Sequence, residues 1–151
     1  MAYDKAEWHY DGDFPAGLPP ENGGTHIGMF LAWAIHRGHV SEMLASTAPA
    51  ELQAVRDRRM TGRTFLFDAC DEKLPEEALS AEGNAFAAAY YERELYFGDY
   101  EQALCAGLPG FYHVADTWDN FEIVCRVIDQ RFQRWQEQSR RPWWQFWKLR
   151  K

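Results

Sequence analysis

The sequence predicts an all-α fold, a compact single domain of several helices that ends in a long C-terminal helix and a short basic, Trp-rich tail. A chain of 151 residues with 46% hydrophobic residues is long enough to bury a core of its own. Apolar residues recur at steps of three and four over residues 25–37 and 117–139, which is typical of helices with a buried face. No segment alternates apolar and polar residues as half-buried strands do, so a β-rich fold is not expected.

The domain organisation follows from where glycine and proline interrupt the chain. Residues 11–24 contain three prolines and four glycines, and they predict an ordered loop that leads into the first helix. That helix is expected from Thr25 to Arg37, with Gly38 ending it, and its nearly continuous apolar surface predicts a central position. We therefore expect a helical domain over residues 1–139 and a tail over residues 140–151.

Short helices are expected between the first helix and the last. Their start signals are Ser or Thr side chains, which can cap a helix, and a proline suited to a first helical position: Ser41, Pro49, Thr61 and Ser80. The helix after Thr61 is expected to end at a polar break over residues 70–73. A further short helix is expected over residues 96–105, with an interruption at Gly98.

The last helix has the clearest pattern in the sequence. It is expected from Thr117 to about Ser139, with acids near its start and arginines near its end, as the helix dipole favours. Its inward stripe consists of Trp118, Phe121, Val124, Cys125, Ile128, Phe132 and Trp135.

The cysteines and the apolar runs indicate a cytoplasmic protein. Cys70, Cys105 and Cys125 are an odd number at wide spacing without a CxxC motif, so we expect buried thiols in a reducing compartment. The N-terminal segment is acidic and aromatic, unlike a secretory signal. The apolar run at residues 27–35 is too short to cross a bilayer.

The charge is divided unevenly along the chain. Residues 131–151 carry seven Lys or Arg and one acid, so of the total net charge of −7 the body before them carries −13. An acidic body repels nucleic acid and favours a basic protein partner. The alternative is that the charge only maintains solubility.

Common catalytic and cofactor motifs are missing from the sequence. There is no GxGxxG, GxxxxGK[ST], GxSxG or HExxH motif, so no cofactor and no metal ion is expected. His36 and His39 are close in sequence but lack the spacing of a metal site. If the protein were an enzyme, its first candidates would be polar residues near helix ends, namely His26, Asp68, Asp71, His113 and Asp116.

Two clusters of acids and tyrosines predict a partner-binding surface. Acids are densest around residues 68–77, and acids alternate with aromatics over residues 90–101. Tyrosines surrounded by charge often anchor interfaces, although the same aromatics could equally belong to the core. The predicted partner-binding residues are Asp71, Glu72, Glu76, Tyr91, Glu94, Tyr96 and Asp99.

The tail combines tryptophans with cations. Trp143, Trp144 and Trp147 lie among Arg and Lys residues, a composition that suits a membrane interface. The alternatives are a hydrophobic latch on the domain and insertion into a partner.

Several segments resemble a family of small bacterial proteins of unknown function. They are WHYDGDFP (8–15), THIGMFLAWAI (25–35), TGRTFLFDACDEKL (61–74), EGNAFAAAYY (82–91) and YHVADTWDNFEIVCRVIDQRF (112–132). The resemblance covers most of residues 4–135 and implies a helical fold. It supplies no catalytic residues.

The leading functional hypothesis is a binding protein, specifically an immunity protein that blocks the active site of a bacterial toxin. Small acidic cytosolic proteins of such families often have this role, and an acidic surface would suit a basic toxin such as a nuclease. The alternatives are a small enzyme with a polar pocket between helices, and a peripheral membrane adaptor that uses the tail.

Overall fold

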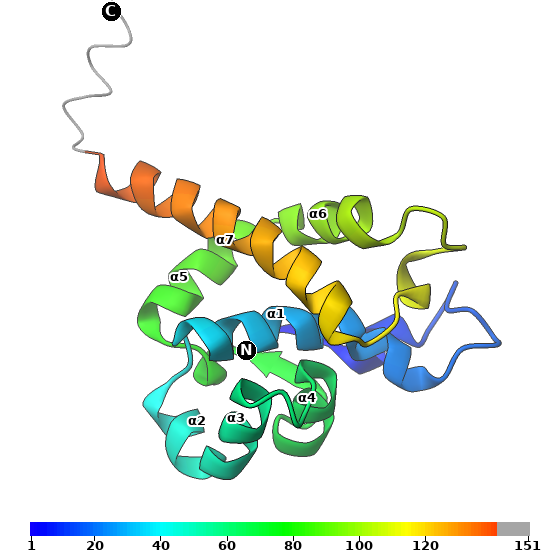
Figure 1. The fold of residues 1–151 in the computed structure, drawn as a ribbon, viewed down its shortest axis with the longest axis horizontal. Coiled ribbons are helices and arrows are strands. Elements are labelled where there is room, and N and C mark those ends of the chain that lie inside the picture. The colour runs from blue at the N-terminus through cyan, green and yellow to red at the C-terminus, as the bar shows by residue number, and fades with distance from the viewer. Residues whose placement is uncertain (142–151) are drawn as a thin grey trace, which may run out of the picture.

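The computed structural model of the protein describes residues 1–141 and confirms the all-α fold (Figure 1). The α-helices in this range are α1 (Thr25–Arg37), α2 (Glu42–Thr47), α3 (Pro49–Arg56), α4 (Gly62–Ala69), α5 (Ala81–Tyr90), α6 (Leu95–Leu104) and α7 (Trp118–Arg140). The 3-10 helices are η1 (Ala6–His9), η2 (Pro20–Gly24), η3 (Glu76–Ala78) and η4 (Phe111–His113). The strands are β1 (Ala2–Lys5) and β2 (Lys73–Pro75).

Helix α1 is the centre of the core, as its apolar surface predicts. Every residue from Thr25 to Ile35 is buried. In the view of Figure 1, α2, α3 and α4 lie on one side of α1, and α5, α6 and α7 lie on the other. Helix α4 crosses α1 where Gly28 faces Gly62, and a Cβ atom on either residue would collide with the other helix's backbone. The two glycines therefore allow the helix backbones to touch.

Helix α7 is fixed to the rest of the domain by ion pairs at its side and by a buried face, which consists of Phe121, Val124, Cys125 and Ile128. Asp129 accepts hydrogen bonds from Trp33 Nε1 at 2.8 Å and from the guanidinium of Arg37, both on α1. Arg131 binds both carboxylate oxygens of Asp99 on α6, at 2.7 and 2.9 Å. None of the helices in residues 1–141 has the length and apolar character that a membrane crossing requires.

Most of the predicted helix boundaries are confirmed. The hydroxyls of Ser41, Thr61, Ser80 and Thr117 each accept a hydrogen bond from the backbone N–H three residues further on. Pro49 occupies the first position of α3. Helix α6 continues through Gly98 without the expected interruption.

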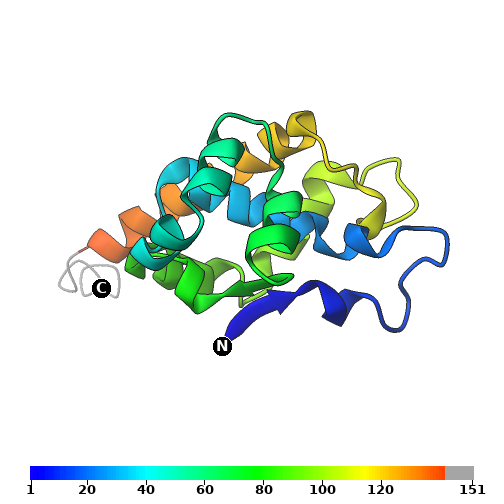
Figure 2. The ribbon, with the colours of Figure 1, turned by 90° about the horizontal axis from the view of Figure 1, so that it is seen from below.

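The two-stranded sheet was not predicted. Strand β1 pairs antiparallel with β2, placing Asp4 opposite Leu74 and Lys5 opposite Lys73. The predicted polar break at residues 70–73 is a turn, with Asp71 and Glu72 at positive φ, that leads directly into β2. Strands of four and three residues are too short to produce a visible alternation in sequence. The pairing brings the N-terminus against the helical body (Figure 2).

Two smaller expectations need correction. The loop over residues 11–24 is regular in its second half, where residues 20–24 form η2. Of the cysteines, only Cys125 is buried, whereas Cys70 and Cys105 are partly exposed.

The tail residues Trp143, Trp144 and Trp147 lie outside the described residues.

Candidate functional site

A cluster of polar side chains lies inside the protein where β1, η1 and the start of α1 meet. Its members are Asp4, His9, His26, Tyr91 and Tyr112. Asp4 points inward because it lies opposite the buried Leu74 in the β1–β2 pair. Asp4 is 3% exposed and His26 is 1% exposed, so the centre of the cluster is shielded from solvent.

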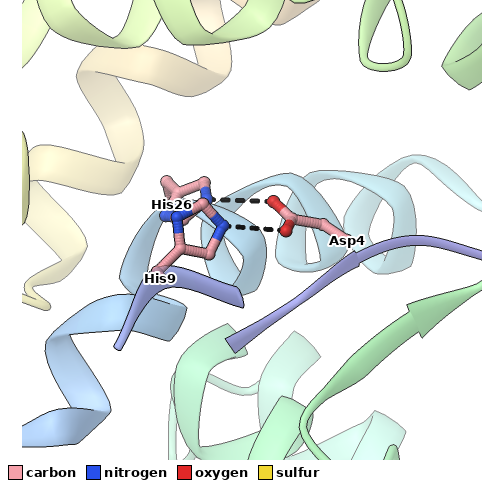
Figure 3. Close-up of side chains that lie close together, drawn as sticks. All are labelled: Asp4, His9 and His26. Atoms are coloured by element: carbon pink, nitrogen blue, oxygen red, sulfur yellow. Dashed lines mark hydrogen bonds and ion pairs between the residues drawn. The ribbon is translucent and has the colours of Figure 1, made fainter. Parts of the chain in front are cut away.

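The carboxylate of Asp4 is the hub of the cluster (Figure 3). Its Oδ1 lies 2.8 Å from Nε2 of His9, and its Oδ2 lies 3.1 Å from Nε2 of His26. The hydroxyl of Tyr91 donates to Oδ2 at 2.6 Å, and the backbone N–H of Lys5 donates to Oδ1 at 2.8 Å. Three side chains and the backbone N–H of the next residue thus converge on one carboxylate.

The two histidines have different surroundings. The side chain of His9 is 15% exposed, and its Nδ1 lies 2.8 Å from the hydroxyl of Tyr112. The ring of His26 is enclosed by aromatic side chains, with Phe111 at a centroid distance of 4.9 Å and Phe97 at 5.4 Å. Its Nδ1 is buried and has no hydrogen-bond partner among residues 1–141. One edge of the cluster therefore reaches solvent, at His9.

Burial and hydrogen bonding set the protonation of the cluster. Burial raises the pKa of Asp4, but the hydrogen bonds from His26 and His9 outweigh it and hold the pKa below its usual range. Burial lowers the pKa of His26, against the attraction of the Asp4 charge. Burial and the charge of Asp4 raise the pKa of Tyr91 well above its usual value. Asp4 is therefore ionised, whereas His26 and Tyr91 are neutral near pH 7.

A carboxylate with two imidazoles offers one oxygen and two nitrogen ligands. Suitable ligand atoms of Asp4, His9 and His26 all lie within 4.8 Å of one another. The same groups can exchange protons, since imidazole is the side chain that titrates closest to neutral pH.

Comparison with known proteins places this cluster inside a recognised domain. The sequence matches a domain of unknown function, DUF7832, over residues 2–114. The chain belongs to the DUF7832 family. All members of the Asp4 cluster lie within the DUF7832 match, whereas α7 follows it in sequence. No curated protein and no solved structure matches the chain.

Three of the predicted partner-binding residues do not form a free surface in this DUF7832 protein. Tyr91 and Tyr96 are 1% and 0% exposed, because their rings stack on each other in the core at 5.1 Å. The hydroxyl of Tyr96 donates to the backbone carbonyl of His26 at 2.6 Å. Asp99 is engaged by Arg131 and by the hydroxyl of Tyr90. Aromatics and acids alternate in this part of the sequence because α5 and α6 each bury an aromatic face and place acids on the other faces.

The other four predicted residues are accessible. Asp71, Glu76 and Glu94 are exposed, and Glu72 is partly exposed. Asp71 and Glu72 border a surface depression that is also lined by Lys5, Glu7 and Lys73. Glu94 lies elsewhere, in the turn before α6.

A different set of aromatic side chains lies in the N-terminal segment, and two of its three members have acidic neighbours. Tyr3 and Tyr10 are half-buried, and Trp8 is 55% exposed. Burial together with the charges of Glu76 and Glu92 raises the pKa of Tyr3.

Tyr10 has an even more acidic environment. Burial raises its pKa to about 12, with contributions from Glu72, Glu21 and Glu7. Its hydroxyl lies 3.5 Å from the carboxylate of Glu72. We call Tyr3, Glu7, Trp8, Tyr10, Glu72 and Glu76 the N-terminal aromatic surface.

The candidates of the enzyme hypothesis are not brought together. No hydrogen bond or ion pair within residues 1–141 joins any two of them. Asp68 and Asp71 are exposed, and Asp116 pairs with Arg63 and Thr61. Only His26 belongs to the Asp4 cluster.

Sequence reasoning missed Asp4, His9 and Tyr112 as site residues. Asp4 and His9 are five positions apart in a segment without a recognised motif. Their further partners are distant in sequence, since Asp4 contacts His26 and His9 contacts Tyr112. The available signal was the composition of residues 3–10, where polar and aromatic residues are denser than in a signal peptide or an ordinary loop.

Proposed function

We propose that this chain is a binding protein for a basic protein partner, of the type in which an immunity protein blocks a bacterial toxin. The proposed contact region is the N-terminal aromatic surface. In this proposal the protein acts in the cytoplasm, and its partner carries a positively charged active site such as that of a nuclease.

The observation that carries the proposal is the set of three accessible aromatics in the N-terminal segment, two of which, Tyr3 and Tyr10, have acidic neighbours. Trp and Tyr are the side chains most often found at the energetic centre of an interface, and a rim of like charge selects a partner of opposite charge. Trp8 is the most exposed of the three, and the ammonium of Lys5 lies over its ring, 5.2 Å from the ring centroid. A cationic partner group could take the place of Lys5 on that ring.

The acidic charge of the surface is only partly neutralised within the domain. Glu7 pairs with Lys5 at 3.8 Å, and Asp71 pairs with Lys73 at 3.0 Å. Among residues 1–141, no ion pair engages Glu72 or Glu76. These two carboxylates are thus available to a basic partner, and charges of this kind accelerate association.

The experiment begins with capture of the tagged protein from its native cell lysate in low and moderate salt. A stoichiometric basic protein is then purified, and its affinity is measured for three forms: wild type, Trp8→Ala and the double variant E72Q/E76Q. Trp8→Ala is expected to weaken binding by about 30-fold, the effect of losing an interface anchor worth about 2 kcal/mol. E72Q/E76Q is expected to slow association and to reduce its dependence on salt.

The matched control is the double variant E42Q/E101Q, which removes two exposed carboxylates on α2 and α6. It raises the net charge by the same two units but leaves the N-terminal aromatic surface intact. Equal losses for the two double variants would show that only the overall charge matters. That result, or the absence of any basic partner, would refute the proposal.

A further inference from the structure

The buried Asp4 cluster has a geometry that partner binding does not explain. Asp4, His9 and His26 come from β1, η1 and α1, and each contributes a potential metal ligand to one small volume. Both imidazoles present Nε2 to the carboxylate (Figure 3). We infer that Asp4, His9 and His26 form a binding site for a divalent transition-metal ion of the zinc type.

The ligand set is the first argument. Two imidazole nitrogens with one carboxylate are a common set of three protein ligands for zinc, and the same set suits related divalent metals. The separations of 2.8 Å and 3.1 Å between nitrogen and oxygen are close to those of ligands that share an ion. For ligands about 2.1 Å from a tetrahedral ion, the expected separation is roughly 3.4 Å, so each imidazole nitrogen would have to move slightly away from its carboxylate oxygen. The ligand atoms of all three residues lie within 4.8 Å of one another.

The surroundings of the ligands are the second argument. Metal-binding groups are held in place by further hydrogen bonds, which fix their orientation. Asp4 has two such bonds, from the hydroxyl of Tyr91 and the backbone N–H of Lys5. His9 has one, between Nδ1 and the hydroxyl of Tyr112. These bonds hold Oδ1 of Asp4 toward Nε2 of His9 and Oδ2 toward Nε2 of His26.

Charge balance is the third argument. A buried carboxylate requires a positive partner, because an isolated buried charge is costly. Within residues 1–141, no Lys or Arg side chain forms an ion pair with Asp4, and its partners are the two imidazoles. His26 is the more deeply buried of the two, at 1% exposure. A divalent ion held by these groups would place positive charge directly against the carboxylate.

The unpartnered Nδ1 of His26 fits the same arrangement. In the absence of metal, Nε2 must carry the proton that the carboxylate accepts, which leaves a bare nitrogen at Nδ1 among aromatic rings. When Nε2 binds metal, the proton moves to Nδ1. An N–H group can then interact with the faces of nearby rings such as Phe111, whereas a lone pair cannot.

The test uses the full chain, stripped with a chelator and titrated with Zn²⁺ in a calorimeter. Wild type is expected to bind one equivalent with a dissociation constant in the micromolar range or below. His9→Gln removes the most accessible ligand and should weaken binding at least 100-fold. Tyr112→Phe removes the hydrogen bond that orients His9 and should weaken binding about 10-fold.

The matched control is His36→Gln, which removes a partly buried histidine outside the cluster. It should leave zinc affinity unchanged and preserve the rise in melting temperature that zinc causes in wild type. Unchanged affinity in His9→Gln, or no binding by wild type, would overturn the inference.

A second measurement on wild type does not depend on whether a variant folds. Nitrogen NMR of the histidine rings should show that zinc shifts Nε2 of His9 and His26. A shift of His36 and His39 in their place, or of no histidine, would also overturn the inference.

Discussion

Replacing Gly28 by alanine tests how closely α1 and α4 approach each other. A methyl group at Gly28 would collide with the backbone of Gly62 and Arg63 on α4. Backbone atoms cannot rotate away as a side chain can, so the helices must separate. Overpacking of this kind costs about 1–3 kcal/mol, and we expect the upper part of that range. Alanine recovers about 1 kcal/mol through its better helix propensity, which leaves a net loss of about 1–2 kcal/mol.

The matched control is Gly98→Ala in α6. Gly98 is also within a helix, but it is exposed, and a Cβ there would meet no atom within 4 Å. The same substitution should therefore stabilise the protein by about 0.5–1 kcal/mol. The two variants are predicted to change stability in opposite directions.

Urea denaturation followed by far-ultraviolet circular dichroism measures both effects from the unfolding midpoint at a common slope. In a thermal scan, each kcal/mol should shift the melting temperature by roughly 2–4 °C for a chain of this size. The close α1–α4 contact would be refuted if Gly28→Ala were neutral or stabilising. It would also be refuted if both variants lost stability equally.

Three further predictions concern individual side chains. Tyr96→Phe should cost about 0.5–1.5 kcal/mol, because it removes the hydrogen bond from the hydroxyl to the buried carbonyl of His26, and urea denaturation measures the loss. A neutral result would argue against this hydrogen bond. Thr117→Ala should cost about 1 kcal/mol by removing the cap on Asn120 N–H, whereas Thr117→Ser should retain most of the stability. Equal losses in both variants would argue against the cap. Burial, aided by nearby arginines, lowers the pKa of His36, so the unfolded chain binds a proton more readily than the folded one. The free energy of unfolding should therefore fall below about pH 6.5, by at most about 1.4 kcal/mol per pH unit for this residue, and His36→Gln should flatten the pH dependence. An identical pH dependence in the variant would contradict the assignment.

The sequence alone determined the helices of this protein. Start signals such as Ser41 and Thr61 act on backbone groups three residues away, and the stripe from Trp118 to Trp135 repeats within one helix. These interactions are local, so they can be recognised without knowing the fold. The central position of α1 was also predictable, because a helix that is apolar all round has to be buried.

Only the tertiary structure decided which polar residues meet. Asp4 reaches His26 across 22 positions and Tyr91 across 87, and it does so because β1 pairs with β2. A pairing between two short strands leaves no periodic signal in either one. The sequence could not predict which tyrosines are exposed, because Tyr91 and Tyr10 both have acidic neighbours in sequence. Tertiary packing buries Tyr91 and leaves Tyr10 half-exposed.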